Sequence, residues 1–234
     1  MARHLDLEEQ EQLDDLKHFW KNYGNLITWL LIVGFGAVAA WNGWQYWQRT
    51  QALQASVLYE EVEKSARDGD ADRIERVFGD MRDKFGRTTY AQQSALLAAK
   101  TLADKGRTEP AKAALTWLAE KGKDEGYQAV ARLRLAGMLA DAKAYDEAMK
   151  HLNAGMPAQF EALAADRRGD ILQLQGKKAE AKAEYTKAYQ AIDERAEYRQ
   201  LIAVKLTALG VDPQSLKPAS SAATAPAASG AAKP

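Results

Sequence analysis

The sequence predicts an all-α protein in which one N-terminal transmembrane helix precedes a solenoid of about four helix pairs and a C-terminal capping helix. Three observations lead to this fold class. A long uncharged segment lies near the N-terminus, the following part repeats every 33 to 37 residues, and no segment shows the sustained alternation typical of strands. We expect four regions: an acidic tail (1–21), an anchor (22–48), the solenoid (49–210) and a disordered Ala/Ser/Pro-rich tail (211–234).

Composition excludes several classes of protein. The 234 residues include no cysteine, which excludes disulfide scaffolds, thiol nucleophiles and thiolate zinc sites. The 32 basic and 32 acidic side chains balance, and this argues against a nucleic-acid partner, because such proteins usually carry a basic excess. An apolar content of 47% is enough to form a core.

The first 21 residues are acidic. They hold six carboxylates and three basic side chains, so their net charge is −3. Leu5, Leu13, Leu16 and Phe19 have roughly helical spacing, which favours a short amphipathic helix. A solvated tail is the alternative, and the sequence leaves both open.

The anchor is predicted from the absence of charge between Lys21 and Arg49, a gap of 27 positions. Its apolar part, Leu26 to Trp47, would span about 33 Å as a helix, which matches a hydrocarbon core about 30 Å thick. Aromatic side chains with a polar edge gather at both ends, as expected for a helix in a lipid bilayer: Trp20, Tyr23, Trp41, Trp44, Tyr46 and Trp47.

Three further predictions concern this segment. The run Ala37-Val38-Ala39 resembles a leader cleavage site, but the long acidic region before it argues for an uncleaved anchor. Lys17 and Lys21 before the span outnumber Arg49 after it, which favours a cytoplasmic N-terminus. Small residues at helical spacing predict a face on which another membrane helix packs: Gly36, Ala39, Ala40 and Gly43.

The repeat in residues 49–210 emerges when the expected turn residues Gly69, Gly106, Lys143 and Gly176 are aligned. The same positions relative to each turn then hold similar residues. Seven residues before lie Val62, Ala99, Ala136 and Gly169; five after lie Ile74, Ala111, Ala148 and Ala181; nine after lie Phe78, Leu115, Leu152 and Tyr185. Small residues where two helices cross, at this period, are typical of stacked helix-turn-helix units. Residues 194–209 would form a helix that covers the end of the stack.

These units resemble the tetratricopeptide family, most clearly in the last one, where Gly169, Leu172, Gly176, Ala181, Tyr185 and Ala188 follow its order of small and large residues. The order of parts is similar to the YfgM family, the ancillary SecYEG translocon subunits. The similarity spans about residues 13–209 and is strongest at "WNGWQYW" and "ADRRGDILQLQGKKAEAKAEY". The acidic N-terminus is longer than that family's, and the Ala/Pro tail is an addition.

That resemblance implies a single-pass protein of the bacterial inner membrane, with a cytoplasmic N-terminus and a periplasmic tetratricopeptide-like domain. It also implies three kinds of partner: Sec translocon subunits, a membrane-anchored prolyl-isomerase-like periplasmic chaperone, and emerging secretory polypeptides. None of these expectations follows from spacing alone.

The sequence predicts no catalytic, cofactor or metal site. The three histidines are isolated, and no phosphate-binding loop occurs. Asp166 and Asp170 lie on one helix face, but Arg167 and Arg168 beside them favour a satisfied charge cluster over a catalytic pair. By analogy with the family register, a protein-binding groove would be lined by Gln93, Leu96, Lys100, Val130, Leu133, Leu163, Asp166, Asp170 and Gln173, of which about half would pack in the core.

Two functional hypotheses follow. The first is a membrane-anchored interaction module, ancillary to the Sec translocon, that links emerging secreted proteins to periplasmic chaperones. The alternative is a periplasmic tetratricopeptide scaffold for cell-envelope assembly, with its leader removed.

Overall fold

The computed structural model describes residues 7–216, with side chains from Lys17 onward. The all-α prediction is confirmed: within these residues there are nine α-helices, two short 3-10 helices and no strand. The expectations for residues 1–6 and 217–234 lie outside the described residues. The α-helices are α1 (Leu7–Asp68), α2 (Ala71–Phe85), α3 (Thr89–Asp104), α4 (Thr108–Lys121), α5 (Glu125–Asp141), α6 (Tyr145–Asn153), α7 (Glu161–Leu174), α8 (Lys178–Ala191) and α9 (Tyr198–Ala208).

The chain divides into two compact units, residues 1–54 and 55–234, and α1 runs through the boundary without a break. In the first unit, α1 contains an 18-residue window with a mean hydropathy of 1.7, long and apolar enough to cross a membrane. The large apolar side chains of this part are exposed, including Trp29 at 63%, Phe35 at 72% and Trp41 at 64%. Such a surface is unfavourable in water and favourable in lipid.

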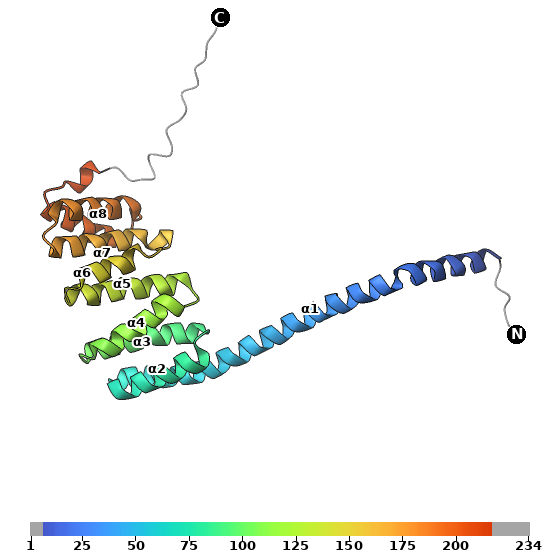
Figure 1. The fold of residues 1–234 in the computed structure, drawn as a ribbon. Coiled ribbons are helices and arrows are strands. Elements are labelled where there is room, and N and C mark those ends of the chain that lie inside the picture. The colour runs from blue at the N-terminus through green and yellow to red at the C-terminus, as the bar shows by residue number, and fades with distance from the viewer. Residues whose placement is uncertain (1–6, 217–234) are drawn as a thin grey trace, which may run out of the picture. The chain divides into compact units, whose positions relative to one another are not determined.

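The second unit is a stack of helix pairs in sequence order (Figure 1). The last turns of α1 pair with α2, because Val62 shares a core cluster with Ile74 and Phe78 and Glu61 pairs with Arg73. The other pairs are α3 with α4, α5 with α6, and α7 with α8. Pro157 precedes the 3-10 helix Ala158–Phe160, which leads into α7. The four predicted pairs are therefore confirmed.

The four predicted turn residues share one backbone conformation. Gly69, Gly106, Lys143 and Gly176 all have positive φ, between 62° and 78°. Each turn closes with the same two hydrogen bonds. The amide of the turn residue donates to the carbonyl of the residue three positions earlier, and the amide of the next residue donates to the carbonyl five positions before that next residue. At Lys143 these bonds measure 2.9 Å (to Ala140) and 2.8 Å (Ala144 to Leu139). This geometry ends the first helix and reverses the chain into the second.

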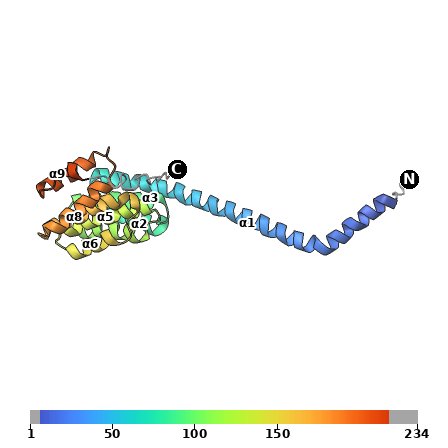
Figure 2. The same cartoon turned by 90° about the horizontal axis from the view of Figure 1, so that it is seen from above.

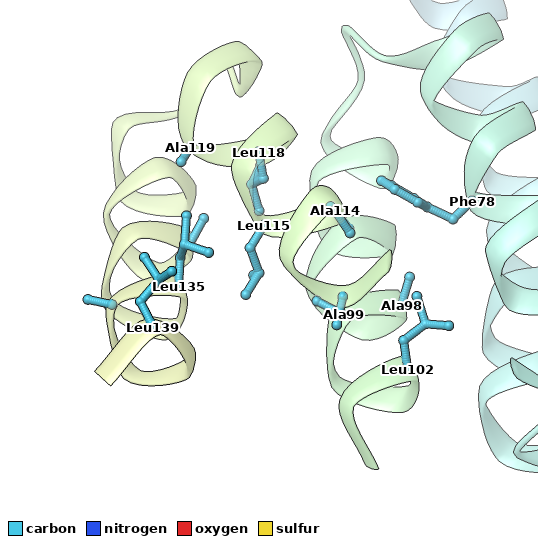
Figure 3. Packing of buried hydrophobic residues seen from close by; sticks show 14 of the residues in the cluster. Phe78, Ala98, Ala99, Leu102, Ala114, Leu115, Leu118, Ala119, Leu135 and Leu139 are labelled. Carbon is cyan, nitrogen blue, oxygen red and sulfur yellow. The ribbon is translucent and has the colours of Figure 1, made fainter. Parts of the chain in front are cut away.

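The predicted crossing positions are buried in every pair. Three positions were predicted at the crossing: seven residues before each turn, five after it and nine after it. The side chains or glycines at all three positions are buried in every pair. The tightest crossing is at Gly169, where an added Cβ would lie 2.6 Å from the Tyr185 ring. Figure 3 shows the equivalent packing of Ala99, Leu115 and Leu135 in the middle of the stack.

A final helix was expected over residues 194–209, and α9 occupies Tyr198–Ala208 beside α8 (Figure 2). Its Ile202 and Leu206 are fully buried against the last pair. Disorder was expected from residue 211, but the described residues show order as far as Leu216. Val211 and Leu216 pack against this cluster, and Pro213–Ser215 form a 3-10 helix, because apolar side chains still follow the Gly210 turn.

We predict opposite effects from two turn substitutions. Lys143→Gly should stabilise the fold by about 0.5–1 kcal/mol. A non-glycine residue at positive φ costs about 1–2 kcal/mol, and glycine removes this cost but loses more backbone entropy when the chain folds. Gly106→Ala should destabilise it by about 1 kcal/mol through φ alone, since its Cβ would meet no atom within 4 Å. Urea unfolding of the full-length chain in detergent micelles, followed by circular dichroism, measures both. A lower midpoint for Lys143→Gly would contradict this view of the turn.

Candidate binding surface

The nine predicted groove residues all lie on the first helices α3, α5 and α7. On α3, the Gln93 side-chain amide donates a 3.1 Å hydrogen bond to the Tyr127 hydroxyl, which links α3 to α5. Lys100 is exposed and pairs with Asp104 at 2.9 Å. Both polar members of the predicted set on α3 therefore already have side-chain partners.

The apolar members of the set are neither fully buried nor fully exposed. Leu96 and Leu133 are partly buried and pack against the main core cluster, and Val130 and Leu163 are also half-buried. These side chains contribute to packing between helices and leave part of their surface accessible, so the groove prediction for them remains a prediction.

A surface hollow of about 460 Å³ lies beside Lys100, between the end of α1 and α3. Its lining combines apolar or small side chains with charged side chains of both signs. The predicted groove included no residue before Gln93, so it did not include the part of this hollow that α1 lines. The hollow is lined by Glu63, Ala66, Arg67, Gly69, Leu97, Lys100, Thr101, Asp104 and Lys105.

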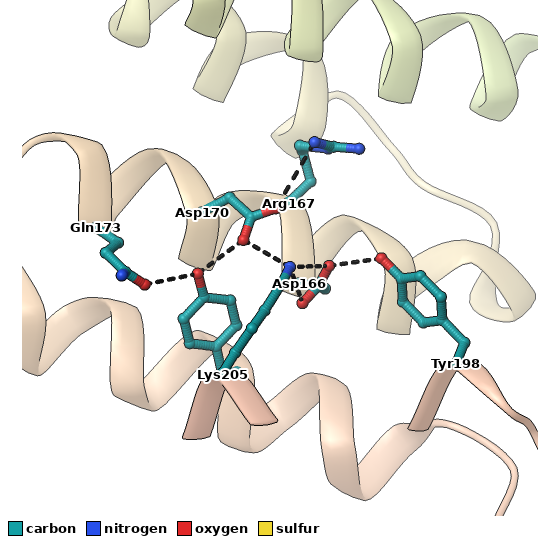
Figure 4. A network of polar contacts seen from close by, with 7 residues as sticks. Asp166, Arg167, Asp170, Gln173, Tyr198 and Lys205 are labelled. Carbon is teal, nitrogen blue, oxygen red and sulfur yellow. Dashed lines mark hydrogen bonds and ion pairs between the residues drawn. The ribbon is translucent and has the colours of Figure 1, made fainter. Parts of the chain in front are cut away.

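The predicted residues on α7 belong to a polar network with α8 and α9 (Figure 4). The Lys205 ammonium of α9 donates to both oxygens of Asp166 at 2.8 Å and to Asp170 at 2.6 Å. The Tyr198 hydroxyl donates to Asp166 at 2.7 Å, and the Tyr185 hydroxyl donates to Asp170 at 2.7 Å. Two carboxylates one turn apart therefore receive donors from two other helices.

This network shows that α9 covers part of the expected groove. Asp166 is 1% exposed, and Gln173 lies 3.1 Å from the Tyr185 hydroxyl. Asp170 also pairs with Arg167 at 3.6 Å. The expected charge cluster is present, but its main cation is Lys205, which lies 39 and 35 residues away from the two aspartates and gave no local signal in the sequence.

The second predicted arginine has other partners. Arg168 is largely buried, pairs with Glu161, donates to Glu184 at 2.8 Å and reaches the Leu152 carbonyl at 3.3 Å. Burial alone would raise the pKa of the Glu184 carboxyl, but hydrogen bonds from Lys187 and Arg168 outweigh it and lower this pKa below its ordinary value. This second cluster joins α7, α8 and the end of α6.

Burial also raises the pKa of Tyr185 and of Tyr198, and the adjacent carboxylates Asp170 and Asp166 raise both further. Both phenols therefore stay protonated at neutral pH and act as hydrogen-bond donors. The network consists of matched donors and carboxylates, which suits it to hold α9 in place.

No group of three or more histidine, cysteine or carboxylate side chains suited to a metal ion occurs among the described residues. His18 lies 3.3 Å from the Asn22 amide on an exposed face of α1, and His151 is half-buried near the end of α6. On the anchor, the predicted packing residues Gly36, Ala39, Ala40 and Gly43 are exposed, and a Cβ on either glycine would meet no atom within 4 Å. That face is open to another helix.

We predict that Lys205→Met weakens the docking of α9 by about 2 kcal/mol or more, because it leaves the buried Asp166 carboxylate without its cation. Hydrogen exchange of the full-length chain in detergent should show faster exchange in α9. Lys182→Met, on the exposed side of α8, is the matched control and should change stability by less than about 0.5 kcal/mol. Unchanged exchange in Lys205→Met would show that apolar contacts alone hold the helix.

We also predict acid sensitivity at Glu184. Because its folded-state pKa is lowered, its contribution is complete above the ordinary value of 4.5 and is lost as the pH falls through the lower folded-state value. Glu184→Gln should therefore destabilise the chain at pH 7 by about 1–2 kcal/mol. The difference in melting temperature between the variant and the unmodified chain should stay constant well above pH 4.5 and should shrink as the pH falls below that value. A difference independent of pH would contradict the assignment.

Comparison with known proteins extends these observations. Residues 17–211 match the family described as a tetratricopeptide repeat-like domain. A protein of Neisseria gonorrhoeae is 32% identical over 213 residues, which cover 89% of this chain and all of the relative. A protein of Escherichia coli K12 is 30% identical, covering 75% and 84% of the two chains, and one of Haemophilus influenzae is 28% identical, covering 79% and 90%. Each of the three is named an ancillary SecYEG translocon subunit.

Proposed function

Because the chain belongs to the tetratricopeptide-like family of ancillary SecYEG translocon subunits, we propose that it is a membrane-anchored interaction module that links emerging secreted proteins to periplasmic chaperones. The relatives and the apolar helix fit a single-pass inner-membrane protein. In this proposal the N-terminus is cytoplasmic, the solenoid is periplasmic, and the protein binds rather than catalyses.

The continuity of α1 is the observation that carries the proposal. The same helix supplies the exposed apolar anchor and, in its last turns, the first helix of the solenoid. Val62, in those last turns, is fully buried in the main core cluster. A binding domain built onto its own anchor remains at the membrane, where a short link gives an effective concentration in the millimolar range.

The first helices supply the binding surface in this proposal. Half-buried leucines such as Leu96 and Leu133, together with the hollow beside Lys100, offer mixed apolar and charged contacts. Such a surface is suited to an extended segment or a partner helix held weakly. Weak binding is sufficient when the anchor keeps the domain next to a channel exit.

The partners of the two units can be separated by photo-crosslinking in cells. A crosslinker at Gly36 should capture Sec translocon subunits, because this face of the anchor is open. A crosslinker at Leu133 should capture a membrane-anchored prolyl-isomerase-like chaperone or emerging secretory chains. Lys182, exposed on the second helix α8, is the control position and should capture neither.

The alternative, a cell-envelope scaffold with a cleaved leader, predicts different results. The mature protein would lack residues 1–39 by intact mass, and the crosslinks would contain only envelope-assembly proteins. Either result would overturn the translocon proposal.

A further inference from the structure

The hollow beside Lys100 lies where a first helix carries a short side chain in place of a long one. Thr101 stands five residues before its turn, and the same position holds Met138 in α5 and Ile171 in α7. Met138 and Ile171 pack in the main core cluster. The shorter threonine leaves a space of about 460 Å³ against the end of α1.

Thr101 also brings an unsatisfied hydroxyl to this hollow. Its side chain is only 7% exposed, and its hydroxyl makes no hydrogen bond with any residue that the structure describes. The hydroxyl is not sealed off, because Ser94 holds the one side-chain atom in the described part of the chain that is both fully buried and unbonded. A nearly buried hydroxyl without a partner costs free energy, so the hollow offers a donor that a ligand can satisfy.

Lys105 adds an ammonium group that has no carboxylate partner among the described residues. Its side chain lies across the turn at Gly69, where an added Cβ would come within 2.7 Å of the ammonium nitrogen. The residue just before the turn is Asp68, Ala142 and Gln175 in the other three pairs, so this cation is particular to the second unit.

The other charged side chains of the hollow form pairs with one another. Lys100 binds Asp104 at 2.9 Å, and Arg67 lies 3.8 Å from Glu63. The lining thus holds three basic and two acidic side chains, and the unmatched charge is that of Lys105. This positive excess favours an anionic ligand.

The remaining lining is apolar and sets a second requirement. Leu97 and Ala66 are half-buried, pack against the main core cluster and line the hollow. A small inorganic anion would leave both of them uncovered. A volume of about 460 Å³ lies within the range of about 300–1,000 Å³ that is typical of ligand sites, so a larger ligand with an apolar part fits better.

We propose that this hollow binds an aspartate or glutamate side chain of an extended, otherwise apolar segment of a partner polypeptide. The carboxylate accepts hydrogen bonds from the Lys105 ammonium and the Thr101 hydroxyl, and a neighbouring apolar side chain covers Leu97. Hydrogen bonds to an ionised group are the stronger kind. The proposal rests on the proposed function in one respect, that the anchor brings such a partner to this surface.

A second hollow, of about 510 Å³ between α4, α5 and α6, provides an internal contrast. Its charged lining has the opposite excess, with the carboxylates Glu109, Glu120 and Glu147 against Lys112 and Lys121. A carboxylate ligand is disfavoured there. Lys121 is exposed and lines this hollow, so it serves as the control position.

The test uses the full-length chain in lipid nanodiscs and the peptide Gly-Ser-Leu-Glu-Leu-Ser-Gly, amidated at its C-terminus and carrying an N-terminal benzophenone crosslinker. The peptide is titrated to about 10 mM, because a tethered partner acts at a millimolar effective concentration. Crosslinking should saturate and should map by mass spectrometry to residues 63–69 and 97–105. Glutamine in place of the glutamate should raise the half-saturating concentration about tenfold.

Three variants of the chain separate the contributions. Lys105→Gln and Thr101→Val should each weaken binding about tenfold, since each removes one hydrogen bond to the carboxylate. Thr101→Met, which copies the residue of α5 at this position, should abolish crosslinking by filling the hollow. Lys121→Gln is the matched control and should bind as the unmodified chain does. Circular dichroism checks that each variant keeps its helices, and Thr101→Val should keep its full stability because the hydroxyl has no partner to lose.

Four outcomes would overturn the proposal: no saturation up to about 10 mM, equal binding of the glutamine peptide, equal binding by Lys105→Gln and Thr101→Val, or binding only when the peptide has a free C-terminal carboxylate. The Gly36 crosslink to the translocon is measured separately. Its absence would refute the proposed function without altering the peptide result, and failure of the peptide would leave that crosslink unchanged.

Discussion

The crossing between the first and second helix of each pair sets the geometry of the solenoid. A small residue on the first helix lets the large side chain of the second approach, and at Gly169 the Tyr185 ring leaves no room for a methyl group. A left-handed turn places the two helices in this register. One pair cannot bury its apolar surface alone, so each depends on the next. The core is therefore continuous from Val62 to Ile171 and ends in a second cluster under α9.

Most of the fold could be predicted from local patterns in the sequence. Turn glycines, alanines at fixed offsets and an uncharged apolar run are all visible within one repeat length, so the four pairs and the membrane helix were predictable. Lys143 was placed at a turn only because its neighbours matched, and the structure gives it the same backbone as the glycines. The ordered structure of residues 211–216 was not predicted. Only two large apolar side chains, Val211 and Leu216, occur there, and the low-complexity sequence that follows favoured a prediction of disorder.

The candidate binding surface was less predictable, because it depends on contacts between distant segments. The register placed Asp166 and Asp170 on an open face, but Lys205 and Tyr198 arrive there from α9, more than 30 residues later. Whether a first-helix residue faces a groove or a neighbour is decided by the following unit.

The unbroken passage of α1 into the first pair also affects how the protein is degraded. Arrays of repeats lose structure from their ends, where each unit has only one neighbour. Here the first helix of the array is the end of α1, which also contains the apolar segment. Unfolding the N-terminal end of the array therefore requires breaking a helix that continues into that segment. Fraying therefore begins at α9, and proteases that attack opened segments would shorten the domain from its C-terminal side.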